Sequence, residues 1–172
     1  MGTRLRRRLL FRAAVMAVAA LTLAAGVAAS EANRFKSDLL GTNEFPVADL
    51  DGRGKASVRI NTETGEVCFD VSWRDGGTAN RGHIHRGAAG VNGPIVVSFF
   101  DLHLPEHAGD PRHDILEQRN ELRDCVTADP AVLAEIVANP AGFYVNLHNA
   151  RFPGGFVRGQ LRMVGGASDL SR

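Results

Sequence analysis

Residues 55–73, KASVRINTETGEVCFDVSW, contain two segments in which apolar and polar side chains alternate. The segments are separated by NTETG (61–65), whose asparagine, threonines and glycine are typical of a turn. Alternation with a period of two places one set of side chains on one face of a strand, so we predict a β-hairpin with one buried face. The predicted inward set is Ala56, Val58, Ile60, Val67, Phe69, Val71 and Trp73.

Strand patterns continue on the C-terminal side of this hairpin. The segments GPIVVSFF (93–100), GFYVNLH (142–148) and GGFVRGQLRM (154–163) are short, apolar or alternating, and bounded by turn residues. Many short strands of this kind predict an all-β sandwich or barrel. One short helix is expected in DPAVLAEIVANP (129–140), with Asp129 as the N-cap, Pro130 in the first turn and an end at Asn139. The polar stretch 101–120 is expected to be an irregular loop.

The first 29 residues have the three parts of a secretory signal peptide. A head with five arginines precedes an alanine-rich apolar segment that ends in Val27-Ala28-Ala29. This order predicts cleavage after Ala29 and a secreted or periplasmic protein. An uncleaved anchor is the alternative, but the apolar segment is short and alanine-rich, so we expect no transmembrane segment after cleavage. The adjacent arginines are also compatible with twin-arginine export. The tail 165–172 is expected to be disordered.

The charge of the exported chain argues against one class of partner. The full chain has 20 basic and 19 acidic residues. Removing residues 1–29 takes away five arginines and no acidic residue, which leaves 15 basic and 19 acidic residues, a formal charge of −4. Nucleic-acid binding is therefore not expected. The partner implied by export is an extracytoplasmic ligand or protein.

Two cysteines, Cys68 and Cys125, are the only ones in the chain. In an oxidising compartment a lone, distant pair is expected to form one disulfide. A pair of metal-binding thiolates is the alternative, although no C-x-x-C spacing supports it.

The histidines carry the strongest chemical signal. His83 and His85 are two residues apart in a predicted strand, so their side chains point to the same side. On the later strands, His148 lies on the face opposite the apolar residues, and so do the polar residues of the same segments. If the strands are neighbours, a polar patch forms outside the sheet. Its predicted members are His83, His85, Glu44, Asn146, His148, Arg158 and Gln160.

This patch has two interpretations. Two imidazoles at i and i+2, joined by His148 from another strand, could form a three-histidine site for copper or zinc. Alternatively, these are ordinary polar residues that support loops: Asn146 and Gln160 would satisfy loop backbone, and Glu44 would neutralise Arg158. No serine has a visible base and orienting partner, so no catalytic residues are assigned and the sequence does not indicate an enzyme.

Three segments together resemble the CHRD domain, which is named for chordin and also occurs in secreted bacterial proteins. They are LLGTNEFPV (39–47), GHIHRGAAGVNGPIVV (82–97) and FYVNLHNARFPGGFVRGQL (143–161), and the resemblance extends over residues 35–164. Val47 departs from the family, which often has a second proline there. Phe156 also departs, since a glutamate or alanine is more usual. Neither departure removes a histidine.

The resemblance implies a β-sandwich with Greek-key character and no established reaction. It favours a non-enzymatic binding or structural module. The alternative function is a copper or zinc protein that uses His83, His85 and His148, with redox activity as one use of copper. A weaker likeness connects the chain to copper–zinc superoxide dismutase, another Greek-key fold with an H-x-H pair. Its further metal ligands have no counterpart by motif after His85, and fold likeness alone does not define function.

Overall fold

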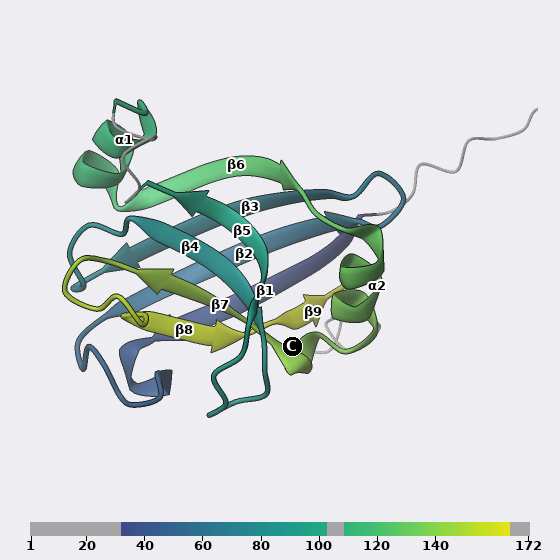
Figure 1. Cartoon of the computed structure of the whole chain (residues 1–172), viewed down its shortest axis with the longest axis horizontal. Coiled ribbons are helices and arrows are strands. Elements are labelled where there is room, and N and C mark those ends of the chain that lie inside the picture. Colours follow the sequence, from purple (N-terminus) through teal and green to yellow (C-terminus); the bar gives the residue numbers. More distant parts are fainter. Residues whose placement is uncertain (1–31, 103–108, 166–172) are drawn as a thin grey trace, which may run out of the picture.

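The computed structural model describes residues 32–102 and 109–165 and is dominated by β-strands (Figure 1). The strands are β1 (Asn33–Leu40), β2 (Arg53–Asn61), β3 (Glu66–Arg74), β4 (Arg81–Arg86), β5 (Ile95–Asp101), β6 (Glu121–Thr127), β7 (Phe143–His148), β8 (Val157–Gln160) and β9 (Arg162–Val164). The helices are α1 (Arg112–Arg119) and α2 (Pro130–Ala138), with short 3-10 turns η1 (Gly41–Asn43) and η3 (Pro140–Gly142).

All pairings within the sheet are antiparallel, and the strand order is β5-β4-β7-β8-β1-β2-β3-β6, with β9 also paired to β1. The edge strands β5 and β6 approach each other, so the sheet curls into a nearly closed barrel (Figure 1). Pairing of β3 with β6 and of β4 with β7 requires crossover connections, as in a Greek key. The prediction of an all-β fold is therefore confirmed. Of the two predicted architectures, sandwich and barrel, the structure is closer to the barrel.

The quoted hairpin forms as predicted by its alternation. β2 and β3 pair in a register that places Ala56 opposite Val71 and Val58 opposite Phe69. All four side chains are buried inside the barrel. Phe69 stacks on Phe99 of the edge strand β5, with ring centroids 4.4 Å apart, and so connects β5 with β3, the neighbour of the other edge strand. The hydrophobic face predicted from the period of two is the barrel core.

One helix is predicted, and the described residues contain two. α2 matches the prediction: Asp129 accepts a hydrogen bond from the backbone N–H of Ala131, Pro130 is in the first turn, and Asn139 ends the helix. The prediction of an irregular loop over 101–120 is wrong in part, because α1 lies within it. Only Leu116 of α1 is buried among the side chains described, so the helix has almost no apolar periodicity from which to predict it.

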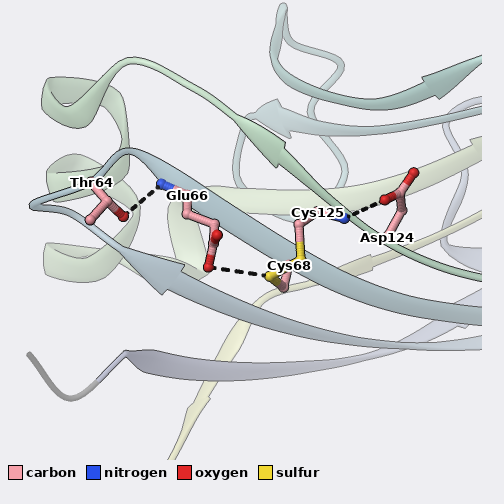
Figure 2. Close-up of a disulfide and its surroundings, with 5 residues drawn as sticks. All are labelled: Thr64, Glu66, Cys68, Asp124 and Cys125. Carbon is pink, nitrogen blue, oxygen red and sulfur yellow. Dashed lines mark hydrogen bonds between the residues drawn. A yellow bond between two sulfur atoms is a disulfide. The ribbon is translucent and has the colours of Figure 1, made fainter. Parts of the chain in front are cut away.

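The predicted disulfide is present and joins neighbouring strands. Cys68 of β3 lies directly opposite Cys125 of β6, and their sulfur atoms are bonded (Figure 2). The bond excludes the alternative in which both cysteines are thiolate ligands. Glu66 lies beside the disulfide. The group formed by Glu66, Cys68 and Cys125 therefore contains no thiolate that could bind a metal.

Some predictions lie on residues that the structure does not describe. The signal peptide 1–29 and the tail beyond Gly165 are in this part of the chain. No helix among the described residues is long and apolar enough to cross a membrane.

Candidate metal centre

The predicted polar residues of β4, β7 and β8 share one face, in rows that cross three neighbouring strands, whereas Glu44 lies in the loop after β1. In register, His83 of β4 lies opposite Asn146 of β7, which lies opposite Arg158 of β8. In the next row, His85 lies opposite Tyr144. Residues directly opposite each other in antiparallel strands point to the same side of the sheet. Because the core is on the other side, these side chains all project from the outside of the barrel.

This outer face is covered by loops. His83, His85 and His148 are only 2%, 8% and 5% exposed. The loop between β4 and β5 contributes Gly93, whose carbonyl lies against His85, and the loop between β7 and β8 contributes Pro153, whose carbonyl lies against His148. The strand pattern predicts a polar patch outside the sheet, and the structure shows that loops enclose it.

The three histidines converge. One potential ligand nitrogen from each of the three rings lies within 4.8 Å of the other two. His83 Nδ1 and His148 Nε2 are 3.2 Å apart. The ring centroid of His85 lies 5.6 Å from that of His83 and 5.8 Å from that of His148. The structure therefore brings together all three histidines that the sequence selected, from two adjacent strands.

Backbone contacts fix which nitrogen of two rings is unprotonated. His85 Nδ1 lies 2.9 Å from the carbonyl oxygen of Gly93, and His148 Nδ1 lies 3.1 Å from that of Pro153. A carbonyl only accepts hydrogen bonds, so both Nδ1 atoms carry the proton, and a neutral ring then leaves Nε2 as a bare lone pair. His85 Nε2 is buried and has no hydrogen-bond partner among the described residues. An outer contact of this kind is how proteins orient histidine ligands towards a metal.

Burial also keeps the imidazoles neutral. Desolvation, with smaller contributions from the neighbouring histidines, lowers the pKa of His83 to about 3. Desolvation likewise lowers the pKa of His148 to about 4, and it lowers the pKa of His85. Three neutral rings at physiological pH each carry one lone pair, and metal binding requires deprotonated ligands. In the metal-free site the lone pair of His148 Nε2 accepts a hydrogen bond from His83 Nδ1, so binding of an ion by His83 Nδ1 requires that proton to move to His83 Nε2.

The spacing is close to what one ion requires. Two nitrogens bound at about 2.0–2.1 Å in a tetrahedral arrangement are about 3.3–3.4 Å apart, and no two can exceed about 4.2 Å. The separation of 3.2 Å between His83 and His148 fits directly. A pair at the upper bound of 4.8 Å would have to close by about 1.4 Å to reach the tetrahedral spacing. The donor set contains nitrogen only, which suits copper and zinc rather than calcium or magnesium.

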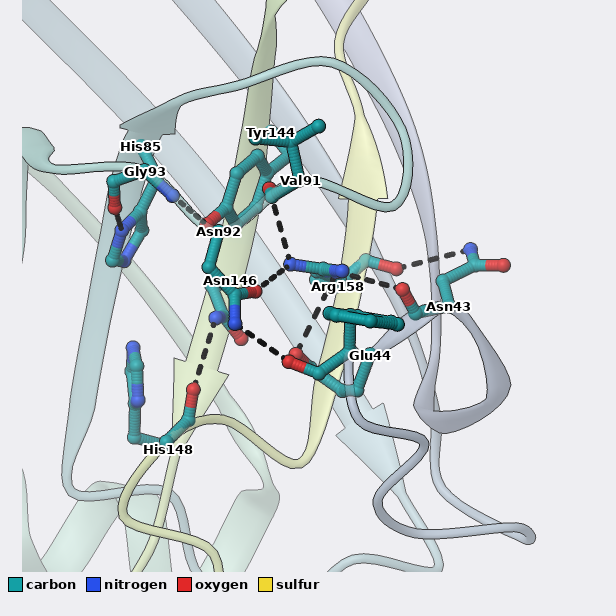
Figure 3. Close-up of polar contacts among 12 residues, drawn as sticks. Asn43, Glu44, His85, Val91, Asn92, Gly93, Tyr144, Asn146, His148 and Arg158 are labelled. Atoms are coloured by element: carbon teal, nitrogen blue, oxygen red, sulfur yellow. Dashed lines mark hydrogen bonds and ion pairs between the residues drawn. The ribbon is translucent and has the colours of Figure 1, made fainter.

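Arg158 connects the loops that cover the site (Figure 3). Its guanidinium donates to the carbonyl of Asn43 at 2.7 Å and to Oδ1 of Asn92 at 2.7 Å. Asn92 in turn donates to the carbonyl of Phe45 at 2.6 Å. We call these residues, together with Glu44, the Arg158 latch, because they tie the loop after β1 to the loop after β4.

Glu44 forms the ion pair with Arg158 that the sequence suggested. The two groups are 3.6 Å apart and both are almost fully buried. Desolvation raises the pKa of Glu44 to about 7 even though the charge of Arg158 opposes the shift. No metal-ligating group of Glu44 joins the histidine cluster, so the geometry gives it a place in the latch and not in the ligand set.

Gln160 and Asn146 support loops. Gln160 Nε2 donates to the carbonyls of Gly87, Ala141 and Phe143. Asn146 Nδ2 makes a long contact of 3.5 Å with the carbonyl of Gly154. Gly155 (φ +124°) packs so closely against Asn146 and Glu44 that an added Cβ would lie within 2.7 Å of both side chains. A larger residue at position 155 would therefore displace the side chains of Asn146 and Glu44, and Asn146 lies between His83 and Arg158 in the sheet.

Sequence reasoning missed the role of Tyr144. Its ring stacks on His85, with centroids 5.0 Å apart and planes 9° apart. The guanidinium carbon of Arg158 lies 4.9 Å from the centroid of the Tyr144 ring. Its hydroxyl accepts a hydrogen bond from the N–H of Gly93, whose carbonyl contacts His85 Nδ1. The available signal was its position, because Tyr144 alternates with Asn146 and His148 on the polar face.

These observations define an all-β protein with a disulfide, a nearly closed Greek-key barrel and a latched, buried cluster of three neutral histidines outside the barrel wall. The family model described as the CHRD domain matches residues 35–161. The match covers most of the chain, and the protein therefore belongs to the CHRD domain family. No curated protein and no solved structure matches it.

Proposed function

We propose that this protein is exported and binds one copper or zinc ion through His83 Nδ1, His85 Nε2 and His148 Nε2. The observation that carries the proposal is the convergence of three buried imidazoles, two of which are held in one tautomer by backbone carbonyls. An unpartnered lone pair on His85 Nε2 would be costly in a site that stayed empty. A metal ion would satisfy that nitrogen and separate the two nitrogens that now face each other.

Copper is the expected ion when both metals are offered. Divalent copper binds nitrogen sites more tightly than zinc in the general affinity order of first-row metals. Neutral imidazoles suit both ions, and the cluster contains neither a carboxylate nor a thiolate that would favour a different metal. A redox role applies only with copper. The protein is then a metal-binding module, and no catalytic residue is proposed.

The other candidate is a binding or structural module without a metal. It would use the polar patch as an exposed contact surface, yet the three histidines, Asn146 and Arg158 are all buried. Burial beneath the Arg158 latch favours a small bound ion over a macromolecular partner at this position. Export is supported by the basic and apolar N-terminal pattern and by the disulfide, which is typical of oxidising compartments.

Elemental mass spectrometry of the purified protein tests the proposal. The protein is produced with its own N-terminus, purified without chelator or histidine tag, and then offered copper and zinc together. We expect close to one ion per chain in the wild type. The triple variant His83→Gln, His85→Gln, His148→Gln should lose the ion.

The chain supplies a matched control in its remaining three histidines. A variant with His103→Gln, His107→Gln and His113→Gln removes the same number of imidazoles and should keep the ion. Equal metal loss in both variants, or no metal in the wild type after loading, would refute the proposal. Circular dichroism of each variant shows whether the barrel is still folded.

A further inference from the structure

A groove lies on the outer face of the other half of the barrel. It has a volume of about 680 Å³ and is lined by residues of β9, β1, β2, β3 and β6. These strands are separate from β4 and β7, which carry the histidines (Figure 1). The disulfide lines one side of the groove, and Figure 2 shows Asp124 next to it. The cationic residues that line the groove are Arg34, Lys36, Arg59 and Arg123.

Most of the positive charge in the groove is not neutralised within the protein. Arg123 pairs with Asp70 at 2.9 Å, which accounts for one cation and one acid. The other acid in the lining, Asp124, lies 3.7 Å from Arg112 outside the groove. Arg34, Lys36 and Arg59 are exposed and form no ion pair with any described residue.

The strand register places like charges directly opposite each other. Arg34 of β1 lies opposite Arg59 of β2, and Lys36 of β1 lies opposite Arg162 of β9. Like charges directly opposite each other destabilise a sheet. Arg162 forms an ion pair with Asp38, but no described acidic residue forms an ion pair with Arg34 or Arg59. The chain beyond residue 29 is acidic overall, with a charge of −4, so this basic cluster does not reflect a generally basic composition.

The shape of the site favours one extended ligand. Residues that lie opposite each other in the sheet form cross-strand rows. The row that contains Arg34 and the row that contains Lys36 run side by side, from β9 through β1, β2 and β3 to β6. Five strands at a spacing of about 4.8 Å span roughly 19 Å, enough for several units of a linear polymer. The three unpaired cations, Arg34, Lys36 and Arg59, lie close together on the adjacent strands β1 and β2 of this span, and such a cluster is complementary to the closely spaced anionic groups of a charged polymer.

We propose that this groove binds an acidic polysaccharide, through carboxylate or sulfate groups that pair with Arg34, Lys36 and Arg59. Single-stranded nucleic acid fits less well, because such sites use aromatic side chains for base stacking. The aromatic residues of the groove, Phe35 and Phe69, are buried in the core instead. A membrane surface fits less well, since it is flat and the unpaired cations line a hollow. The proposal is independent of the metal centre.

Calorimetric titration of the whole protein with a heparin decasaccharide tests this assignment. We expect binding that weakens as salt is added, because exposed ion pairs are screened. Arg34→Gln combined with Arg59→Gln should weaken binding about tenfold, which corresponds to the loss of two exposed ion pairs. The same variant should unfold at an equal or higher temperature than the wild type, because it removes a repulsion.

The matched control is Arg53→Gln combined with Arg74→Gln. These arginines also lie opposite each other on β2 and β3, and they do not line the groove. This variant makes the same charge change and should alter the affinity less than twofold. Equal weakening by both variants would overturn the proposal, as would no binding to heparin. Tighter binding to single-stranded DNA or to anionic phospholipid vesicles than to heparin would also overturn it.

Discussion

The chemistry of the proposed centre depends on three imidazoles that burial holds neutral. Each ring would ordinarily titrate near pH 6.5, and desolvation moves the pKa of His83 and His148 to about 3 and about 4. Such rings offer lone pairs at physiological pH without competition from protons. The same burial makes them sensitive to acid, because the unfolded chain accepts protons that the folded chain refuses.

The metal-free protein should therefore lose stability as the pH falls below about 6.5. Between that value and the lowered pKa values of His83 and His148, unfolding takes up protons, so the free energy of unfolding decreases with decreasing pH. Glu44 acts in the opposite sense, because its pKa is raised to about 7, but it is one group against three. Urea unfolding at pH 7.5, 6.0 and 4.5 measures the effect.

The variant His83→Gln with His148→Gln is the control for this pH dependence. It removes two of the three groups with lowered pKa, so its stability should change much less over the same range. A wild-type protein that is as stable at pH 4.5 as at pH 7.5 would contradict the buried, neutral state of these rings.

Tyr144 is the second residue whose effect can be predicted. Tyr144→Phe keeps the ring stacked on His85 but removes the hydroxyl that accepts a hydrogen bond from Gly93. Because the Gly93 carbonyl orients His85, we expect copper affinity to fall about tenfold, the lower end of typical outer-contact effects. Competitive titration against a copper chelator gives the affinity. An unchanged affinity would mean that Gly93 is positioned without Tyr144.

At the scale of elements, the site depends on two loops crossing the outside of the barrel and on Arg158, which fastens them. It contacts Asn43 and Glu44 in the loop after β1 and Asn92 in the loop after β4, two segments far apart in the chain. Alternation predicted correctly that Arg158 and the histidines share a face. It could not predict that the face is buried, because the covering loops have no periodicity and their course is set by contacts between distant residues.

Arg158→Met should lower the free energy of unfolding by about 3 kcal/mol, because it leaves buried acceptors and Glu44 without their partner. Arg162→Met is the matched control. Arg162 pairs with Asp38 at the surface, and loss of an exposed pair costs less than about 1 kcal/mol. Denaturant unfolding of both variants distinguishes these outcomes. Equal costs for the two substitutions would show that the latch adds no more than a surface ion pair.

At the scale of the whole molecule, regular repetition was the predictable part. The hairpin of β2 and β3, the helix α2 and the pairing of Cys68 with Cys125 followed from period, capping residues and the count of cysteines. α1 did not, since it buries little and forms in a polar segment. The closing of one sheet into a barrel depends on strand order, which pairs β3 with β6 and β4 with β7 and leaves no local trace in the sequence.

The barrel also separates two proposed sites. The histidines lie on β4 and β7, and the basic groove lies across β9, β1, β2, β3 and β6. No described residue contributes to both, so metal binding and polysaccharide binding should be lost independently in the respective variants. This separation allows each site to be tested in a protein whose other site is intact.

A crystal structure of the copper-loaded protein, with anomalous diffraction data on both sides of the copper absorption edge, tests the central claim most directly. The account predicts one anomalous peak per chain, about 2.0–2.1 Å from His83 Nδ1, His85 Nε2 and His148 Nε2. The contacts of the other nitrogens of His85 and His148 with Gly93 and Pro153 should be retained. A peak bound by other residues, or copper-soaked crystals without a peak among these three rings, would contradict it.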